Sequence, residues 1–179
     1  MNKKLLNIGG GKSKDIPSFY DGWEQDLLDI DPNINPDILC DAKDLNIQEQ
    51  YDAVYISHTL EHFYKHEVPI VLNNSYNALK EDGRIEICSP DLKDLILKFA
   101  NSSLDIDDVY YRTGEGFPVT FHDVIYGWSI AMSNGNLFYA HKCGFTPLSM
   151  SIALNNANFK DVVITSNCTN LVGIGYKRK

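Results

Sequence analysis

The chain has 179 residues, enough for one domain with its own hydrophobic core but too few for two. With 44% hydrophobic and 22% charged residues, the composition is that of a globular protein and excludes a collagen, a coiled coil or a disordered chain. Sixteen basic against 24 acidic residues give a net charge of −8. This charge argues against a nucleic acid partner, because nucleic acids are bound by basic surfaces.

The sequence also predicts the cellular compartment of the protein. No apolar run approaches the roughly 20 residues that span a membrane, and the apolar stretch near the N-terminus is too short for a signal peptide. The four cysteines lie far apart and form no Cys-x-x-Cys pair, which is typical of reduced thiols. We therefore expect a cytoplasmic protein with no membrane partner.

Short apolar segments that alternate with loops and helices predict an α/β fold with a mostly parallel, doubly wound sheet. The expected strands are residues 4–8, 26–30, 37–40, 53–57, 84–89, 161–165 and 171–176. A short turn joins the last two, so we expect them to form an antiparallel hairpin. Helices are expected from Pro69 to a stop at Gly83, over the stripe from Leu92 to Phe99, and after an N-cap at Thr146.

Polar residues or glycines follow each of the first five strands. In chain order they are Gly9-Gly10-Gly11, Asp29-Ile30-Asp31, Asp41, Ser57-His58 and Ser89-Pro90-Asp91. Ligands of open parallel sheets bind beyond the carboxyl ends of the strands, near the change in strand order. The sequence therefore predicts a ligand site at this edge.

The spacing of these residues narrows the choice of ligand. Glycine after the first strand lets a ligand approach the backbone closely, and Asp29, 20 residues after Gly9, can accept the two hydroxyls of a ribose. A dinucleotide site needs Gly-x-Gly-x-x-Gly at the start of a helix, whereas the last glycine position here is Lys14 and residues 15–23 form a poor helix. A nucleoside without a pyrophosphate fits better.

Five motifs in this order resemble those of the class I S-adenosylmethionine-dependent methyltransferases, and most closely a group of small bacterial methyltransferase-like proteins. The motifs lie at residues 6–11 (LNIGGG), 28–32 (LDIDP), 40–45 (CDAKDL), 51–62 (YDAVYISHTLEH) and 79–83 (LKEDG). A later stretch, residues 135–146, is similar to a segment of the closer group. The resemblance implies a single Rossmann-like domain over residues 1–179, with a seven-stranded sheet and an antiparallel C-terminal hairpin.

The same resemblance implies that the cofactor is S-adenosyl-L-methionine. Gly9 and Gly11 would border its methionine part, Asp29 would bind the ribose hydroxyls, Asp41 would accept from the adenine amine, and the Ala42 backbone would meet the ring. The full expected cofactor-binding set is Gly9, Gly10, Gly11, Asp29, Ile30, Asp41, Ala42, Ser57 and His58.

Two positions depart from the family pattern. Asn7 stands where the family usually has an acid that contacts the amino group of the cofactor, and Ser13 replaces a common third glycine. The helix that normally follows the first strand is expected to be truncated or absent. These departures keep open a second interpretation, a non-catalytic protein that binds the cofactor without turnover.

The expected catalytic residues are His58, Asp91 and His141. A histidine with a pKa near neutrality can take a proton from an acceptor hydroxyl, and Asp91 follows the fifth strand at the same sheet edge. His62 and His66 are four residues apart, but no third ligand has suitable spacing, so we expect no metal.

Residues 101–145 have weak periodicity and many aromatic side chains. We expect this segment to cap the site and to bind the acceptor, because loops on a rigid scaffold carry specificity. Simple packing against the sheet is the alternative, and an exposed remainder would provide the face of a homodimer.

The sequence thus predicts a methyltransferase that acts on a small-molecule or glycan-type acceptor. The segment after the fourth strand lacks the Asn/Asp-Pro-Pro-aromatic run of enzymes that methylate base amines, which argues further against nucleic acid. A nucleotide-dependent oxidoreductase remains a third interpretation, disfavoured by Lys14.

Overall fold

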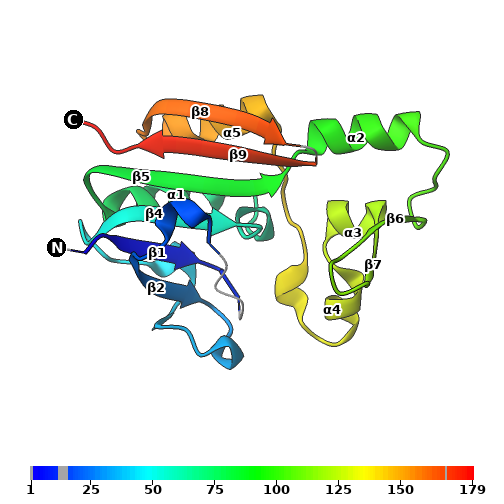
Figure 1. The fold of residues 1–179 in the computed structure, drawn as a ribbon, viewed down its shortest axis with the longest axis horizontal. Helices are drawn as coiled ribbons and strands as arrows, with labels where there is room; N and C mark the ends of the chain where they lie inside the picture. Colours follow the sequence, from blue (N-terminus) through cyan, green and yellow to red (C-terminus); the bar gives the residue numbers. More distant parts are fainter. Residues whose placement is uncertain (1, 12–15, 168) are drawn as a thin grey trace.

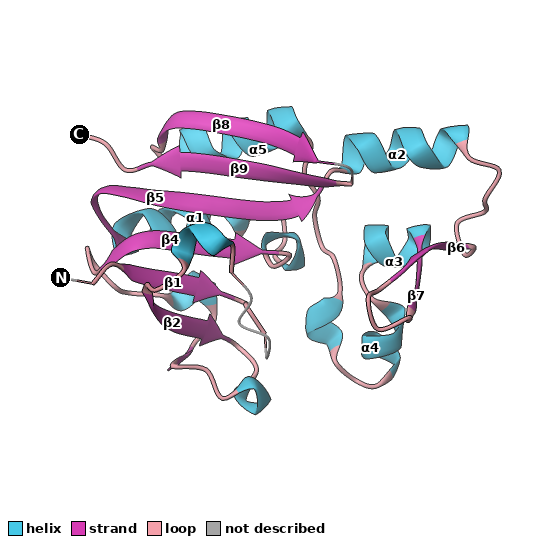
Figure 2. Ribbon diagram, in the orientation of Figure 1, coloured by secondary structure: helices cyan, strands magenta, loops and turns pink. Residues whose placement is uncertain are grey.

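The computed structural model describes residues 2–11, 16–167 and 169–179, and within these ranges it contains a seven-stranded sheet (Figures 1 and 2). In spatial order the strands are β3 (Ile38–Leu39), β2 (Glu24–Asp29), β1 (Lys4–Ile8), β4 (Tyr51–Ser57), β5 (Leu79–Pro90), β9 (Asn170–Tyr176) and β8 (Lys160–Asn167). Each expected strand is present, with ends that differ by a few residues.

Strand directions confirm the predicted fold class. The strands from β3 to β5 run parallel, whereas β9 is antiparallel to both β5 and β8. In β1, Ile8 pairs with Leu28 of β2 on one side and with Ile56 of β4 on the other. The chain therefore leaves β1 toward one edge of the sheet and later returns on its other side. This change in strand order is where an open α/β sheet binds its ligand.

Two helices, α1 (Val68–Ala78) and α5 (Pro147–Asn156), pack against one face of the sheet. Thr146 caps α5 as expected, in a capping box with Ser149. The expected end of α1 at Gly83 is wrong. The helix stops at Ala78, because residues 79–83 already belong to β5, where Leu79 pairs with Tyr51.

The other face of the sheet is covered by aromatic side chains next to β1 and β4. Tyr20 is fully buried against Leu5, Ala53 and Tyr55, and Trp23 packs beside it. Among residues 16–23, the only helical element is a 3₁₀ turn at Ser18–Tyr20, in agreement with the poor helix expected there. Ser13 and Lys14, where the sequence departs from the nucleotide-binding patterns, lie outside the described residues.

The segment between β5 and α5 lies beyond the carboxyl ends of the strands (Figure 1). It contains α2 (Leu92–Asn101), a hairpin of β6 (Val109–Arg112) and β7 (Pro118–Thr120), α3 (Phe121–Tyr126) and α4 (Ser129–Ser133). These elements are short, which explains the weak periodicity of the sequence. No helix in the described ranges is both long and apolar enough to cross a bilayer.

Candidate cofactor site

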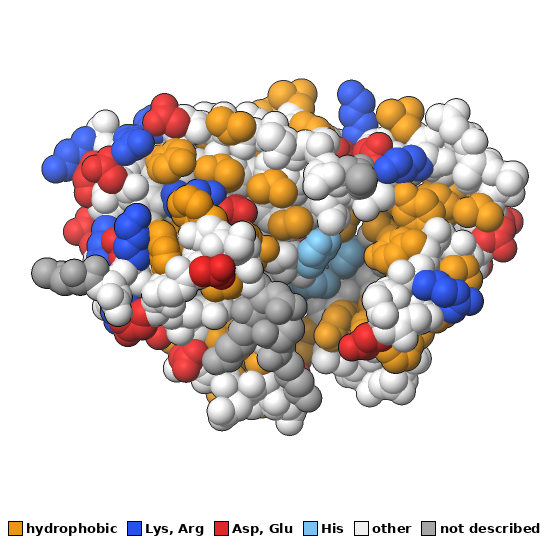
Figure 3. All heavy atoms as spheres, in the orientation of Figure 1, with side chains coloured by type: hydrophobic (Ala, Val, Ile, Leu, Met, Phe, Trp, Pro, Cys, Tyr) orange, Lys and Arg blue, Asp and Glu red, His pale blue; other side chains and the backbone are white. Residues whose placement is uncertain are grey.

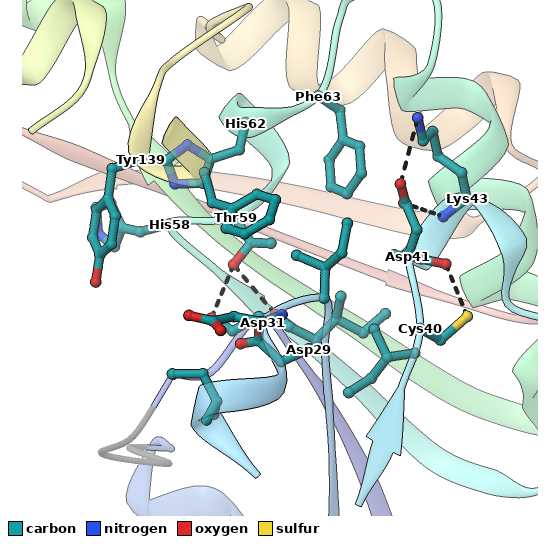
Figure 4. A pocket seen from close by; sticks show the side chains of 18 of the residues that line it. Asp29, Asp31, Cys40, Asp41, Lys43, His58, Thr59, His62, Phe63 and Tyr139 are labelled. Atoms are coloured by element: carbon teal, nitrogen blue, oxygen red, sulfur yellow. Dashed lines mark hydrogen bonds and ion pairs between the residues drawn. The ribbon is translucent and has the colours of Figure 1, made fainter. Parts of the chain in front are cut away.

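A cavity of about 300 Å³ opens at the carboxyl ends of β1, β2 and β4 (Figure 4). This volume is at the lower end of the range for pockets that bind drug-sized ligands, roughly 300–1,000 Å³. In the space-filling view, histidine side chains lie in a hollow between the strand ends and the segment that carries α3 and α4 (Figure 3). The predicted edge of the sheet is therefore the edge that is hollowed.

The glycines after β1 have backbone conformations that other residues rarely adopt. Gly9 has a φ of +70° and Gly11 a φ of +61°, and both line the cavity. A Cβ on Gly9 would lie 2.4 Å from side-chain atoms of Thr59, whereas one on Gly11 would meet no described heavy atom within 4 Å. Gly9 thus fits closely under Thr59, and Gly11 leaves open space into which a ligand can extend.

Asn7 is buried beneath this loop. A Cβ on Gly10 would lie 2.3 Å from Nδ2 of Asn7, so the amide packs directly under the glycine backbone. Asn7 is fully buried, and neither amide atom has a hydrogen-bond partner among the described residues. A buried polar group without partners is costly, so this amide is available to a ligand or to the loop that follows.

Asp29 stands at the end of β2 and lines the cavity together with Ile30 and Asp31. Its Oδ1 accepts a hydrogen bond from the Asp31 amide at 3.0 Å, which orients the carboxylate, and no described residue is recorded on Oδ2. Ile30 is 42% exposed, so it presents an apolar surface beside this acceptor. A carboxylate next to an apolar wall suits a ribose attached to a flat base.

Asp41 and Ala42 line the neighbouring wall, after β3. Asp41 caps a 3₁₀ turn at Ala42–Asp44 by accepting from the Lys43 amide at 3.0 Å. The Lys43 ammonium lies 3.5 Å from Oδ2 of Asp41 and 2.7 Å from Oε1 of Glu67. The hydrogen bond from Lys43 lowers the pKa of Glu67, so this wall carries a paired, ionised cluster.

His58 lines the cavity but has both ring nitrogens engaged. Nδ1 lies 3.4 Å from Oε1 of Glu61, and Nε2 lies 3.8 Å from Sγ of Cys88. Burial of the ring lowers the pKa of His58, but the hydrogen bond with Cys88 and the ion pair with Glu61 outweigh it and raise the pKa to about 10. The near-neutral pKa that we expect of a histidine base is therefore not found at His58.

Asp91 lies away from the cavity and is buried, with 3% exposure. Its carboxylate caps α2, accepting from the backbone amides of Lys93 at 3.0 Å and Asp94 at 3.3 Å, and it also accepts from the Ser166 hydroxyl at 2.8 Å. All of these contacts belong to the fold. Ser57 and Gly10 are likewise absent from the cavity lining among the described residues.

His141 lines a smaller hollow next to the main cavity. Its Nδ1 donates to the Val124 carbonyl at 3.0 Å when protonated there, Nε2 has no recorded partner among the described residues, and burial lowers its pKa. The ring lies 5.0 Å, centroid to centroid, from His62, which lines the main cavity. His141 is therefore a neutral imidazole near, but not in, the cavity.

Several lining residues were not expected from the sequence. These are Thr59, His62 and Phe63, which follow β4. Phe138 and Tyr139, from a 3₁₀ turn at Leu137–Tyr139, also line the cavity, and they belong to the aromatic segment 101–145 that is expected to cap the site. His62 and His66 do not share a helical face, because the 3₁₀ turn Leu60–His62 ends before His66.

Comparison with known proteins shows the fold. No protein-family model matches the chain, and no curated protein does. Among solved structures, an S-adenosylmethionine-dependent methyltransferase from Archaeoglobus fulgidus has a TM-score of 0.62 at 16% identity, covering 98% of this chain and 86% of that one. The 1,6-didemethyltoxoflavin-N1-methyltransferase of Burkholderia thailandensis, with its substrate and S-adenosylhomocysteine bound, has a TM-score of 0.61 at 15% identity, covering 99% and 72%.

Human N-acetylserotonin methyltransferase in complex with S-adenosylmethionine has a TM-score of 0.61 at 15% identity. The match covers 98% of this chain but 48% of the human one, so the chain spans about half of that enzyme's length. At these identities the likeness concerns the fold alone. The resemblance to class I methyltransferases is confirmed at that level: the chain has the Rossmann-like fold of the S-adenosylmethionine-dependent methyltransferases.

Proposed function

We propose that the protein transfers a methyl group from S-adenosylmethionine to an oxygen or nitrogen atom of a small-molecule or glycan-type acceptor. The observation that carries this proposal is the cavity at the change in strand order. There the glycines after β1, Asp29 after β2 and Asp41 after β3 line a single volume on a methyltransferase fold.

The residues of the cavity fit this cofactor. Asp29 offers a carboxylate oxygen to the ribose hydroxyls, and Asp41 with the Ala42 backbone offers an acceptor and a donor to the adenine edge. Gly11 leaves room beside the backbone for the methionine part. Asn7 carries no charge, but its amide, which has no hydrogen-bond partner among the described residues, can form hydrogen bonds at the same glycine loop. Ile30 and Phe63 supply apolar surface for the adenine ring.

The bound cofactor supplies a methyl group on a sulfonium, ready for displacement by a nucleophile held in line. Of the expected catalytic residues, His141 is best suited to accept the acceptor's proton, because it is neutral and its Nε2 meets no recorded partner in the part of the chain that the structure describes. Both nitrogens of His58 are engaged, so we assign it the role of a positive charge at the cavity wall. We assign Asp91 to the capping of α2.

We propose that residues 101–145 cap the acceptor. Phe138, Tyr139 and Asn136 from this segment line the cavity and would exclude water from the reacting atoms. A small acceptor agrees with the negative net charge, and two of the structural neighbours are named for small molecules that they methylate. The cysteine pattern supports a cytoplasmic location.

The test is a calorimetric titration with S-adenosylmethionine, S-adenosylhomocysteine and NAD in parallel. Micromolar binding of the two adenosyl ligands, with no heat from NAD, is expected. Binding of NAD alone would favour an oxidoreductase, and no binding of any ligand would refute the proposal. Release of S-adenosylhomocysteine in proportion to added acceptor would then separate a methyltransferase from a protein that only binds the cofactor.

A further inference from the structure

Cys88, His58 and Glu61 form a line of contacts beside the cofactor cavity. Cys88 of β5 pairs in register with Ser57, the last residue of β4, and its carbonyl accepts a hydrogen bond from the His58 amide at 2.8 Å. The thiol lies 3.8 Å from Nε2 of His58, and Nδ1 of the same ring lies 3.4 Å from Glu61. Thiol, imidazole and carboxylate thus stand in the order of a nucleophile, its proton partner and the group that orients that partner.

Glu61 is the buried end of this line. Its side chain is 1% exposed, and neither carboxylate oxygen receives a hydrogen bond from the described residues. A buried carboxylate without hydrogen bonds is stable only next to a positive charge. Besides His58, the titratable groups around Glu61 are His62, His141 and Cys143. His58 is the only one of them recorded within ion-pair distance of it among the described residues.

The position of His58 is set by its backbone as well as by Glu61. Its φ of +49° lies in the left-handed region, where histidine is tolerated better than most residues but still under strain. The ring is 48% exposed, so one side faces solvent while both nitrogens remain engaged. A proton on Nε2 then lies next to the sulfur of Cys88, 3.8 Å away, and a histidine cation beside a partly exposed sulfur is the surrounding in which reactive cysteines are found.

The other described thiols lack this arrangement. Burial raises the pKa of Cys143 to about 11, and burial together with Asp44 and Asp41 raises the pKa of Cys40. Neither has a histidine recorded as its hydrogen-bond partner: Cys143 lies near the Leu60 carbonyl and Cys40 near the Asp41 carbonyl. They serve as internal controls within the same molecule.

We propose that Cys88 is a nucleophilic thiol, activated by His58 and Glu61, that adds to small α,β-unsaturated carbonyl compounds. In this step a sulfur electron pair forms the bond to the β-carbon, and the electron pair of the carbon–carbon double bond takes up the proton that His58 holds, which forms the new bond between the α-carbon and hydrogen. The thiol proton of Cys88 then replaces the proton given up by His58, so the ring is returned to its starting state. No group leaves and no oxidant is consumed, so the adduct gains the full mass of the electrophile.

This reaction is independent of the proposed methyl transfer. Cys88 does not belong to the described lining of the cofactor cavity, although it contacts His58, which does. The thiol adduct and the binding of S-adenosylmethionine can therefore be measured separately, and failure of one leaves the other standing.

N-Ethylmaleimide is the probe, added below the protein concentration, with labelled peptides quantified by mass spectrometry. In the unsubstituted protein we expect Cys88 to react at least tenfold faster than Cys40 and Cys143. Equal rates for the three thiols would overturn the proposal. This comparison needs no variant and so does not depend on the folding of one.

Variants then test the two supporting groups. His58→Gln and Glu61→Gln are expected to slow labelling of Cys88 at least tenfold. The control is His66→Gln, which changes an exposed histidine stacked on Tyr64 and should leave the rate unchanged. If folded His58→Gln protein, judged by its thermal unfolding, labels Cys88 as fast as the unsubstituted protein, the proposed role of His58 is wrong.

Discussion

The carboxylate of Glu61 lies 3.4 Å from Nδ1 of His58, although the first side chain is 1% exposed and the second 48% exposed. The pair therefore joins the interior of the protein to the rim of the candidate cofactor cavity. Burial lowers the pKa of His58, but the hydrogen bond with Cys88 and this buried carboxylate outweigh it and raise the pKa of a histidine that would otherwise titrate near neutrality. Together, the contacts with Cys88 and Glu61 explain why His58 holds a proton rather than accepting one from a substrate.

This pair makes stability depend on pH in a defined window. The pKa of His58 is raised from 6.5 to about 10, so its stabilising contribution is complete below pH 6.5 and is lost as the pH rises toward 10. We expect urea unfolding to show that the free energy of unfolding falls between pH 6.5 and pH 9.5. In His58→Gln this fall should be smaller by about 1–2 kcal/mol, which is less than the full pKa shift implies because the ring is half exposed. Equal losses in the two proteins would show that another group causes the effect.

At acid pH the dependence of stability on pH has the opposite sign: stability is lost as the pH falls. Burial raises the pKa of Glu61, but the pairing with His58 and the charge of His62 lower it below 4.5 overall. The contribution of Glu61 is therefore present above pH 4.5 and is lost as the pH falls through its lowered pKa. Glu61→Gln should flatten the acid side of the stability curve, measured by thermal unfolding between pH 3 and 6. A curve as steep as that of the unsubstituted protein would contradict the pairing.

Substitution of Asp29 tests the cofactor assignment. Asp29→Ala removes a charged acceptor of the ribose hydroxyls and should weaken S-adenosylmethionine binding by about 2 kcal/mol, or roughly 30-fold in Kd. Asp82→Ala is the matched control, because Asp82 lies on β5 and does not line the cavity. Calorimetry on both variants gives the comparison, and an unchanged Kd for Asp29→Ala would remove Asp29 from the site.

Gly9 and Gly22 provide a matched pair for the loop after β1. Both have positive φ, so alanine costs about 1–2 kcal/mol of backbone strain at either position. Only at Gly9 would the new Cβ meet Thr59, at 2.4 Å, and this overpacking should add about 1–3 kcal/mol. Urea unfolding should therefore show the larger loss for Gly9→Ala. Equal losses would mean that the Thr59 side chain moves aside at little cost.

Asp91 is expected to act on stability and not on cofactor binding. Asp91→Ala removes the cap of α2 and should cost about 1–2 kcal/mol in the free energy of unfolding. Ser166→Ala, which removes only the hydroxyl that donates to Asp91, should cost about 1 kcal/mol. Both variants should bind S-adenosylmethionine as the unsubstituted protein does. A stable Asp91→Ala protein with weakened binding would return Asp91 to the functional site.

The contacts around Asp91 and His58 are examples of contacts that could not be predicted from the sequence. Asp91 follows a strand whose end lies near the ligand edge, which made it a catalytic candidate. Its carboxylate instead meets Ser166, 75 residues later in the chain, a contact set by the antiparallel pairing of β8 and β9 next to β5. The ion pair between Lys43 and Glu67 was likewise not predictable, because it joins a turn after β3 to the start of α1.

The sequence by itself determined the strands, their mostly parallel order and the placing of Gly9, Gly11, Asp29 and Asp41 at the ligand edge. These features follow from local patterns: apolar runs, turn residues and the polar residue that ends each strand. Only the tertiary structure decided which side chains at that edge share a cavity and which serve the fold. It turned His58 toward Cys88 and Glu61 and brought Tyr139 to the cavity wall, because such contacts depend on strand register and on chain segments far apart in sequence.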